Sequence, residues 1–148
     1  MSPVTESDIS RSFQAVWTSV FGRPLPSAPA RPAAAPSGRA IVARVRISGE
    51  VEQSVVVVCS IEQARRLTAG FFGIDPASVE ESLIRDVFGE VANMVGGLVK
   101  RHFPTPCRLS LPDVREVRTD EPETGPSVQV LFACGDTPLA VRLVQNLS

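Results

Sequence analysis

The segment 78–101 limits the fold more than any other part of the chain, because its apolar residues recur with the period of an α-helix. With Val79 taken as zero and about 100° per residue, these residues fill an arc from about 0° to about 220°. They are Val79, Leu83, Ile84, Val87, Phe88, Val91, Ala92, Met94, Val95, Leu98 and Val99. Ser78 and Glu81 have the spacing of a capping box and predict where the helix begins. An apolar face this wide predicts a long helix that covers a sheet.

Two pairs of β-rich segments supply the predicted sheet. The first pair, 40–48 and 51–59, is joined by a short turn that contains Gly49 and predicts a β-hairpin. The second pair, 127–134 and 137–146, flanks another short turn and predicts a second hairpin.

Residues 60–73 predict a shorter helix, with Ser60 as its N-cap and Gly73 just beyond its last turn. Residues 107–112 predict a short strand, and residues 120–126 predict a loop. Two hairpins with two intervening helices favour an α+β fold, in which long helices pack on one face of an antiparallel sheet.

The N-terminal part of the chain has a different composition. Residues 1–22 predict an amphipathic helix, capped by Thr5 or Ser7 and ended by Gly22. Residues 23–38 are rich in proline and alanine and predict a linker or a long loop before the body of the protein, 39–148. About 20 residues cannot bury a core of their own, so we expect a single domain overall.

Composition and charge argue against several classes of function. The 148 residues carry a formal net charge of −1, and their basic residues gather only in small groups, so we expect no nucleic-acid partner. The apolar run 55–59 is far shorter than the about 20 residues that a membrane helix needs, and the N-terminus has no signal-peptide pattern. We therefore expect a cytoplasmic protein that does not engage a membrane.

The cysteine and histidine content narrows the chemistry further. Cys59, Cys107 and Cys134 lie far apart and form no C-x-x-C pair, which predicts small buried apolar side chains rather than zinc ligands or disulfides. His102 is the only histidine, and it follows the predicted long helix, where a cation interacts favourably with the helix dipole. We predict no metal site on this chain.

A polar stripe runs along one border of the apolar face of the 78–101 helix. Asp86, Glu90 and Asn93 fall within about 60° of one another, so that an amide and two carboxylates line up on one side. Gly97 lies on the same stripe one turn further on. Spacing alone is also compatible with a solvated helix face, because Glu and Asn are common on exposed helix surfaces. The paired glycines 96–97 predict either close approach by another part of the chain or a weak point in the helix.

The stretch 86–97, Asp-Val-Phe-Gly-Glu-Val-Ala-Asn-Met-Val-Gly-Gly, resembles the signature of the CheC–CheX–FliY chemotaxis phosphatases. That signature has Asp or Ser, three residues, Glu, two residues and Asn on a long helix. The turn within 47–51 and the Pro-containing strand that ends at Pro112 are also similar to this family. The resemblance covers about residues 40–147. The single E-x-x-N is similar to CheX rather than to the two-site CheC.

The resemblance implies a phosphatase that removes the phosphoryl group from the aspartate of a phosphorylated, CheY-like response-regulator receiver. By motif position, Asn93 would orient the attacking water and Glu90 would dock on the active-site lysine of the receiver. Asp86 and Gly97 would contribute to partner binding. The resemblance implies no cofactor of the protein's own, with Mg²⁺ held by the receiver, and it is compatible with a homodimer.

Two other hypotheses use the same helix. The chain can be a non-catalytic CheX-like binding module in two-component or chemotaxis signalling, or a structural domain whose stripe is only solvated. Leu98, which stands where the family often has asparagine, and the segment 23–38 favour the binding module. The sequence specifies neither which response regulator is the partner nor whether the pathway controls motility.

Overall fold

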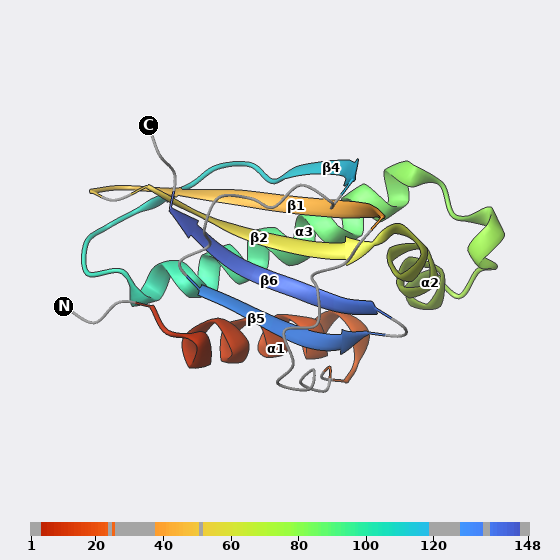
Figure 1. Cartoon of the computed structure of the whole chain (residues 1–148), viewed down its shortest axis with the longest axis horizontal. Helices are drawn as coiled ribbons and strands as arrows, with labels where there is room; N and C mark the ends of the chain where they lie inside the picture. The colour runs from red at the N-terminus through yellow and green to blue at the C-terminus, as the bar shows by residue number, and fades with distance from the viewer. Residues whose placement is uncertain are drawn as a thin grey trace.

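Both predicted hairpins form, and they join in one antiparallel sheet. A computed structural model describes residues 4–23, 25, 38–50, 52–118, 128–134 and 137–145. In it, β1 (Arg39–Ser48) pairs with β2 (Gln53–Ser60), and β5 (Val128–Cys134) pairs with β6 (Thr137–Gln145). Pairing between β2 and β6 connects the two hairpins side by side (Figure 1).

Two further strands lie along the free edge of β1. They are β3 (Arg108–Leu109) and β4 (Asp113–Arg118), and both run antiparallel to β1. The order across the sheet is therefore β3-β1-β2-β6-β5, with β4 beside β1 as well. No strand is predicted over 113–118, because Val114 and Val117 are three residues apart and do not show the period of a strand.

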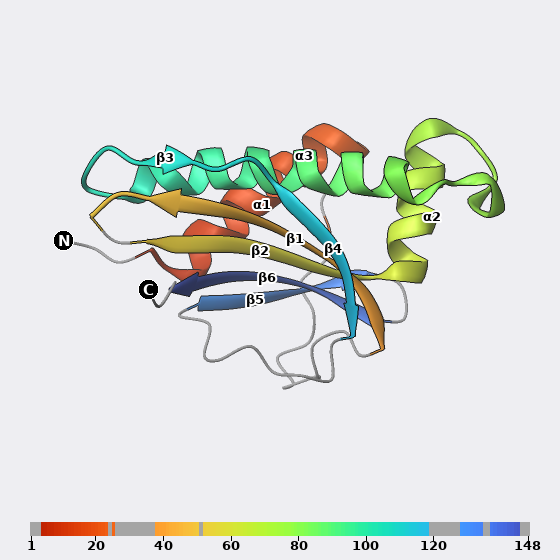
Figure 2. The same ribbon diagram turned by 90° about the horizontal axis from the view of Figure 1, so that it is seen from above.

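Two long helices cover one face of this sheet and a shorter helix lies at its end, which confirms the predicted α+β fold (Figure 2). α3 (Glu81–Val99) packs across β1 and β2, and α1 (Glu6–Phe21) packs beside α3 against β5 and β6. α2 (Ile61–Phe72) contacts β1, β2 and α3. Two short 3₁₀ turns, η1 (Pro76–Ser78) and η2 (Lys100–His102), flank α3.

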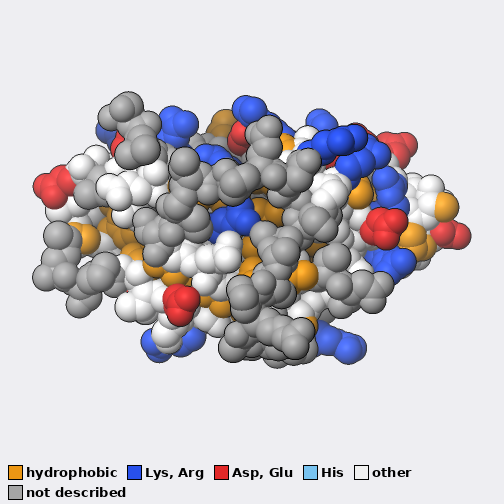
Figure 3. All heavy atoms as spheres, in the orientation of Figure 1, with side chains coloured by type: hydrophobic (Ala, Val, Ile, Leu, Met, Phe, Trp, Pro, Cys, Tyr) orange, Lys and Arg blue, Asp and Glu red, His pale blue; other side chains and the backbone are white. Residues whose placement is uncertain are grey.

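The opposite face of the sheet carries a second, smaller apolar cluster. Its buried members are Ala40, Val56, Val58, Ala140 and Val144. Figure 3 looks onto this face, where apolar side chains and Lys or Arg side chains are both visible. Residue 24 and residues 26–37 of the predicted linker, the predicted loop 120–126 and the turn at 135–136 lie outside the described residues.

Helix α1 supplies much of the aromatic core. Phe13 is fully buried, with its ring centroid 4.7 Å from that of Phe132 on β5 and 5.2 Å from that of Trp17. Ile9 and Val16 are buried on the same side of the helix. The amphipathic pattern predicted for residues 1–22 therefore faces the core that α3 and the sheet share.

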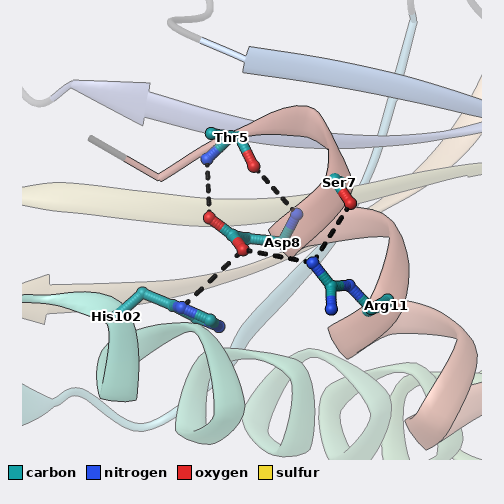
Figure 4. A network of polar contacts seen from close by, with 5 residues as sticks. All are labelled: Thr5, Ser7, Asp8, Arg11 and His102. Atoms are coloured by element: carbon teal, nitrogen blue, oxygen red, sulfur yellow. Dashed lines mark hydrogen bonds and ion pairs between the residues drawn. The ribbon is translucent and has the colours of Figure 1, made fainter. Parts of the chain in front are cut away.

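A capping box fixes the start of α1. The Thr5 hydroxyl accepts the N–H of Asp8 at 3.1 Å, and the Asp8 carboxylate accepts the N–H of Thr5 at 3.0 Å (Figure 4). Asp8 also lies 3.8 Å from Nδ1 of His102 on η2 and 4.0 Å from Arg11. The N-terminus of α1 is thereby tied to the turn that follows α3.

We predict that Asp8→Asn weakens this attachment only at pH values at which the native Asp8 carboxyl is ionised. Hydrogen bonds from Thr5, with smaller contributions from His102 and Arg11, lower the pKa of Asp8 below its ordinary value of 3.8. Because the folded pKa is the lower one, the stabilising contribution is present above about pH 4 and is lost as the pH falls through the folded pKa. Urea unfolding should show a lower midpoint for the variant at pH 5 and a much smaller difference near pH 2. An equal difference at both pH values would contradict the prediction.

The predicted capping box at Ser78 and Glu81 is wrong. Asp75 instead caps the 3₁₀ turn that Pro76 begins, by accepting a backbone N–H at 2.9 Å. Proline suits the first position of such a turn, because its φ is fixed and its missing N–H would have no partner there. Val79 then runs extended with its side chain buried, so α3 begins only at Glu81.

The buried face of α3 is also wider than its apolar residues indicate. Gly89 and Gly96, which helical spacing places on the polar side, are both buried. A helix covered only by the sheet would leave them exposed. The segment that carries β3 and β4 packs against this flank of α3 and covers them.

Candidate functional site

The polar stripe predicted on the long helix lies on the side of α3 that faces away from the sheet. Asp86 and Glu90 are exposed, and Asn93 is half-buried. The opposite side of the helix, including Phe88 and Val95, is buried in the core. Because α3 is continuous from Glu81 to Val99, neighbours three and four residues apart have Cβ atoms about 5–6 Å from each other. The structure thus brings the three polar side chains together on one accessible surface.

The functional groups of the stripe are available to a partner. Within the residues that the structure describes, the side chains of Asp86, Glu90 and Asn93 make no hydrogen bond or ion pair with another residue. A side chain that is already bonded would have to break that bond before binding another molecule. When a partner binds, these three groups have to give up only their hydrogen bonds to water.

Gly97 continues the stripe at the far end of α3. It is half-buried, and a Cβ at this position would meet only Leu109 Cδ1, at 3.9 Å, which is an ordinary contact. Gly96 differs, because a Cβ there would lie 3.0 Å from Cγ1 of Val45 on β1. Of the two explanations that the sequence left open, close approach therefore accounts for Gly96. Gly97 has no side chain, so no group projects from the stripe at this position.

Leu98 lies outside the stripe. Its side chain is half-buried and packs against the main apolar core. Helical geometry places it about 140° around α3 from Asn93. An apolar residue suits this half-buried position, which is not part of the stripe.

The histidine and the cysteines do not contribute to this surface. His102 lies on η2 against Asp8 of α1, as Figure 4 shows. Cys59 and Cys134 are buried and Cys107 is half-buried, with no disulfide among them. Contact with the Cys134 thiol, together with burial, raises the pKa of Cys59 well above its ordinary value, so Cys59 is a protonated thiol at neutral pH. Among the described residues, no three His, Cys, Asp or Glu side chains form a group that could hold a metal ion.

The segment beside Gly89 is a part of the site that sequence patterns did not indicate. A Cβ at Gly89 would meet the side chains of Val114 at 3.4 Å and of Pro112 at 3.6 Å. Pro112, just before β4, and Val114, within β4, therefore line the flank of α3 next to the stripe. Pro112 is the one sequence signal for this arrangement, because proline within a strand region marks an edge or a bulge.

The chemistry available at the stripe follows from its side-chain types. The Asn93 amide can both donate and accept a hydrogen bond while carrying no charge, so it can hold a water molecule next to an anionic group. The carboxylates of Asp86 and Glu90 attract a cation and repel an anion at the same distance. The stripe therefore suits a partner in which a cationic side chain lies beside an anionic reactive group.

Comparison with known proteins gives a consistent result for family and fold. The family model described as "Chemotaxis phosphatase CheX" matches residues 41–132. No curated protein sequence matches the chain. Among the described helices, none has the length and apolar character needed to cross a membrane.

Several solved structures share the fold. CheX from Vibrio vulnificus superposes with a TM-score of 0.76 at 16% identity, over 99% of this chain and 100% of that chain. CheX in a complex with CheY, BeF₃ and Mg²⁺ from Borrelia burgdorferi gives 0.74 at 14% identity, over 98% and 100%. FliY from Thermotoga maritima gives 0.59 at 15% identity, over 98% and 91%. Similarity to these structures spans nearly the whole chain, including the residues that precede the family match.

Proposed function

The chain belongs to the CheX family of chemotaxis phosphatases, and we propose that it hydrolyses the phosphoaspartate of a CheY-like response-regulator receiver. The observation that carries the proposal is the pair Glu90 and Asn93 on α3, accessible to a partner and without a bonding partner among the described residues. The complex between CheX and CheY of Borrelia burgdorferi supports a receiver as the partner.

Asn93 would orient the water that attacks phosphorus. An acyl phosphate is already reactive, so fixing the nucleophile in line with the bond that breaks supplies much of the rate gain. A carboxylate at this position would repel the phosphoryl oxygens, whereas the neutral amide does not. Mg²⁺ held by the receiver would stabilise the charge on those oxygens, and the present chain would supply no cofactor.

Glu90 would fix the docking geometry by pairing with the active-site lysine of the receiver. Glu90 lies one turn before Asn93, so one partner surface can contact both side chains. Asp86, one turn further back, would add to partner binding. Gly97 would leave room for the partner's backbone, because the helix has no side chain there.

We predict that Glu90→Gln weakens docking while leaving the chemical step nearly intact. The substitution keeps the size of the side chain and removes the charge that would pair with the receiver lysine. We expect the KM for the phosphorylated receiver to rise by about tenfold and kcat to change little, because the loss falls on binding. Glu52→Gln, at an exposed position in the β1–β2 turn, is the matched control and should leave both constants unchanged.

The test of the proposed function uses radiolabelled phospho-receivers from the same organism with Mg²⁺. The wild-type protein should accelerate loss of label from at least one of them. Binding to a receiver without acceleration would replace the enzyme by the non-catalytic binding module. Absence of both, across all the receivers of the organism, would leave a structural domain. Sedimentation of the free protein would separately show whether it forms the homodimer that the resemblance allows.

A further inference from the structure

The edge segment that carries β3 and β4 has one residue more than the part of β1 that it pairs with. Ile47 of β1 lies opposite Leu109 of β3, and Arg44 of β1 lies opposite Asp113 of β4. Between these two pairs β1 has residues 45–46, whereas the edge segment has residues 110–112. Two residues therefore oppose three, which defines a β-bulge. Bulges at sheet edges often redirect a side chain or interrupt pairing next to a functional site.

The backbone on both sides of the bulge is held firmly. Ser110 donates its N–H to the carbonyl of Arg46 at 2.9 Å, and the Ser110 hydroxyl accepts the N–H of Arg46 at 2.9 Å. The same hydroxyl lies 2.9 Å from the carbonyl oxygen of Leu111 and donates to it. On the other side, Pro112 has a fixed φ and packs at Gly89. Leu111 is thus held in place between two anchored neighbours.

The bulge lies level with Glu90 and Asn93 of the stripe. Leu109 lies against Gly96 and Gly97, and Pro112 lies against Gly89. Seven residues of α-helix and three residues of strand both span about 10 Å, so the edge segment runs alongside this part of α3. Leu111, between the two contacts, therefore lies beside the turns of α3 that carry Glu90 and Asn93.

Leu111 is the most exposed large apolar side chain among the described residues. The residue is 88% exposed, against 48% for Phe71, 46% for Phe72 and 40% for Ile74. A single exposed leucine is common on soluble proteins and needs no function by itself. A leucine whose backbone is fixed by a bulge beside Glu90 and Asn93 differs, because only its side-chain rotamers remain to be ordered on binding.

We propose that Leu111 is an apolar docking residue for the phosphorylated receiver, next to the polar contacts of Glu90 and Asn93. The inference rests on the proposed function, since the receiver is the partner that would reach both surfaces at once. The receiver would present an apolar patch beside its phosphorylated aspartate, and Leu111 would bury its side chain there. Leu111 would strengthen binding without taking part in hydrolysis.

The experiment compares Leu111→Ser, Leu111→Met and the aliphatic control Ile74→Ser. The binding probe is the receiver domain treated with beryllium fluoride and Mg²⁺, which imitates the phosphorylated state, and kcat and KM are measured on the phospho-receiver. We expect Leu111→Ser to raise both Kd and KM by about tenfold and to leave kcat unchanged. Leu111→Met should restore binding to within about twofold, because it keeps the apolar volume. Ile74→Ser should match the wild type.

Each outcome separates the inference from the function on which it rests. If the wild type hydrolyses the phospho-receiver and Leu111→Ser binds as tightly as the wild type, the inference is overturned and the proposed function stands. If the wild type binds the receiver without hydrolysis and Leu111→Ser binds more weakly, the docking surface stands and the enzyme does not. If the wild type neither binds nor hydrolyses any receiver, both fail. A change of oligomeric state in Leu111→Ser, seen by sedimentation, would assign the residue to contact between copies of this chain instead.

Discussion

Replacing Asn93 with alanine should abolish most of the acceleration of receiver dephosphorylation, with a fall in kcat of about 100-fold or more. Removing one well-placed hydrogen-bonding group that acts on the reacting atoms costs this much in other enzymes. Among the described residues, the only other polar side chains of the stripe are the carboxylates of Asp86 and Glu90. Neither can replace a neutral amide beside a phosphoryl group without repelling it. The measurement is the rate of label loss from the phospho-receiver at saturating receiver concentration.

The loss should be confined to the chemical step. Asn93 is only half-buried, and alanine favours helix more than asparagine does, so the variant should be at least as stable as the wild type. Its Kd for the beryllium fluoride-treated receiver should change by less than about threefold. Ser82→Ala, an exposed position near the start of α3, is the matched control and should keep full activity. Full activity in Asn93→Ala would exclude the proposed mechanism, whereas a parallel loss of binding would make Asn93 a docking residue.

The second large effect concerns stability. Phe13→Ala should lower the free energy of unfolding by about 3–5 kcal/mol, because it removes a fully buried ring and leaves a cavity. The ring stacks on Phe132 of β5 and on Trp17 of α1. Its loss therefore removes a contact between α1 and the sheet and a contact within α1. Domains of this size are stable by about 5–15 kcal/mol, so a loss of this size would remove a large share of the total. Urea unfolding, followed by Trp17 fluorescence, measures the difference.

The same experiment tests whether α1 folds together with the body of the protein. Ser19→Ala, an exposed position on α1, should change the stability by less than about 0.5 kcal/mol. If Phe13→Ala also cost less than about 1 kcal/mol, α1 would be an appendage rather than part of the core. A single cooperative transition in the wild type is the expected accompaniment, because α1 and α3 share one apolar cluster.

Local signals in the sequence predicted most of the secondary structure correctly. The Gly49 turn between two β-rich segments predicts the β1–β2 hairpin, and Ser60 and Gly73 predict the limits of α2. These signals are reliable because capping and turn formation depend on residues close together in the chain. Ser78 was misleading, because the sequence of Asp75 and Pro76 favours a 3₁₀ turn over the same residues.

β4 was not predictable, because its pairing with β1 defines it as a strand, whereas its own sequence shows no alternation of apolar and polar residues. Val114 faces Gly89 of α3, and the charged residues around it lie along an edge that only pairing with β1 creates. The bulge at Leu111 follows from the register of β3 and β4 on β1, which no local pattern specifies.

The polar stripe shows which part of the site the sequence determined. The spacing of Asp86, Glu90 and Asn93 places them on one side of any α-helix, because the helical period is fixed by backbone geometry. The sequence therefore determined that an amide and two carboxylates lie on a common surface. Its resemblance to the phosphatase family suggested the proposed chemistry, and the match over residues 41–132 establishes that family.

Tertiary structure decided what surrounds that surface. Gly96 and Gly89 look like part of the polar side in the sequence, yet Val45 and Pro112 cover them in the fold. The stripe is consequently bordered on one flank by the edge segment that holds Leu111. Local spacing fixes the directions of side chains along one helix, whereas strand register and packing across the sheet determine which distant residues stand beside them.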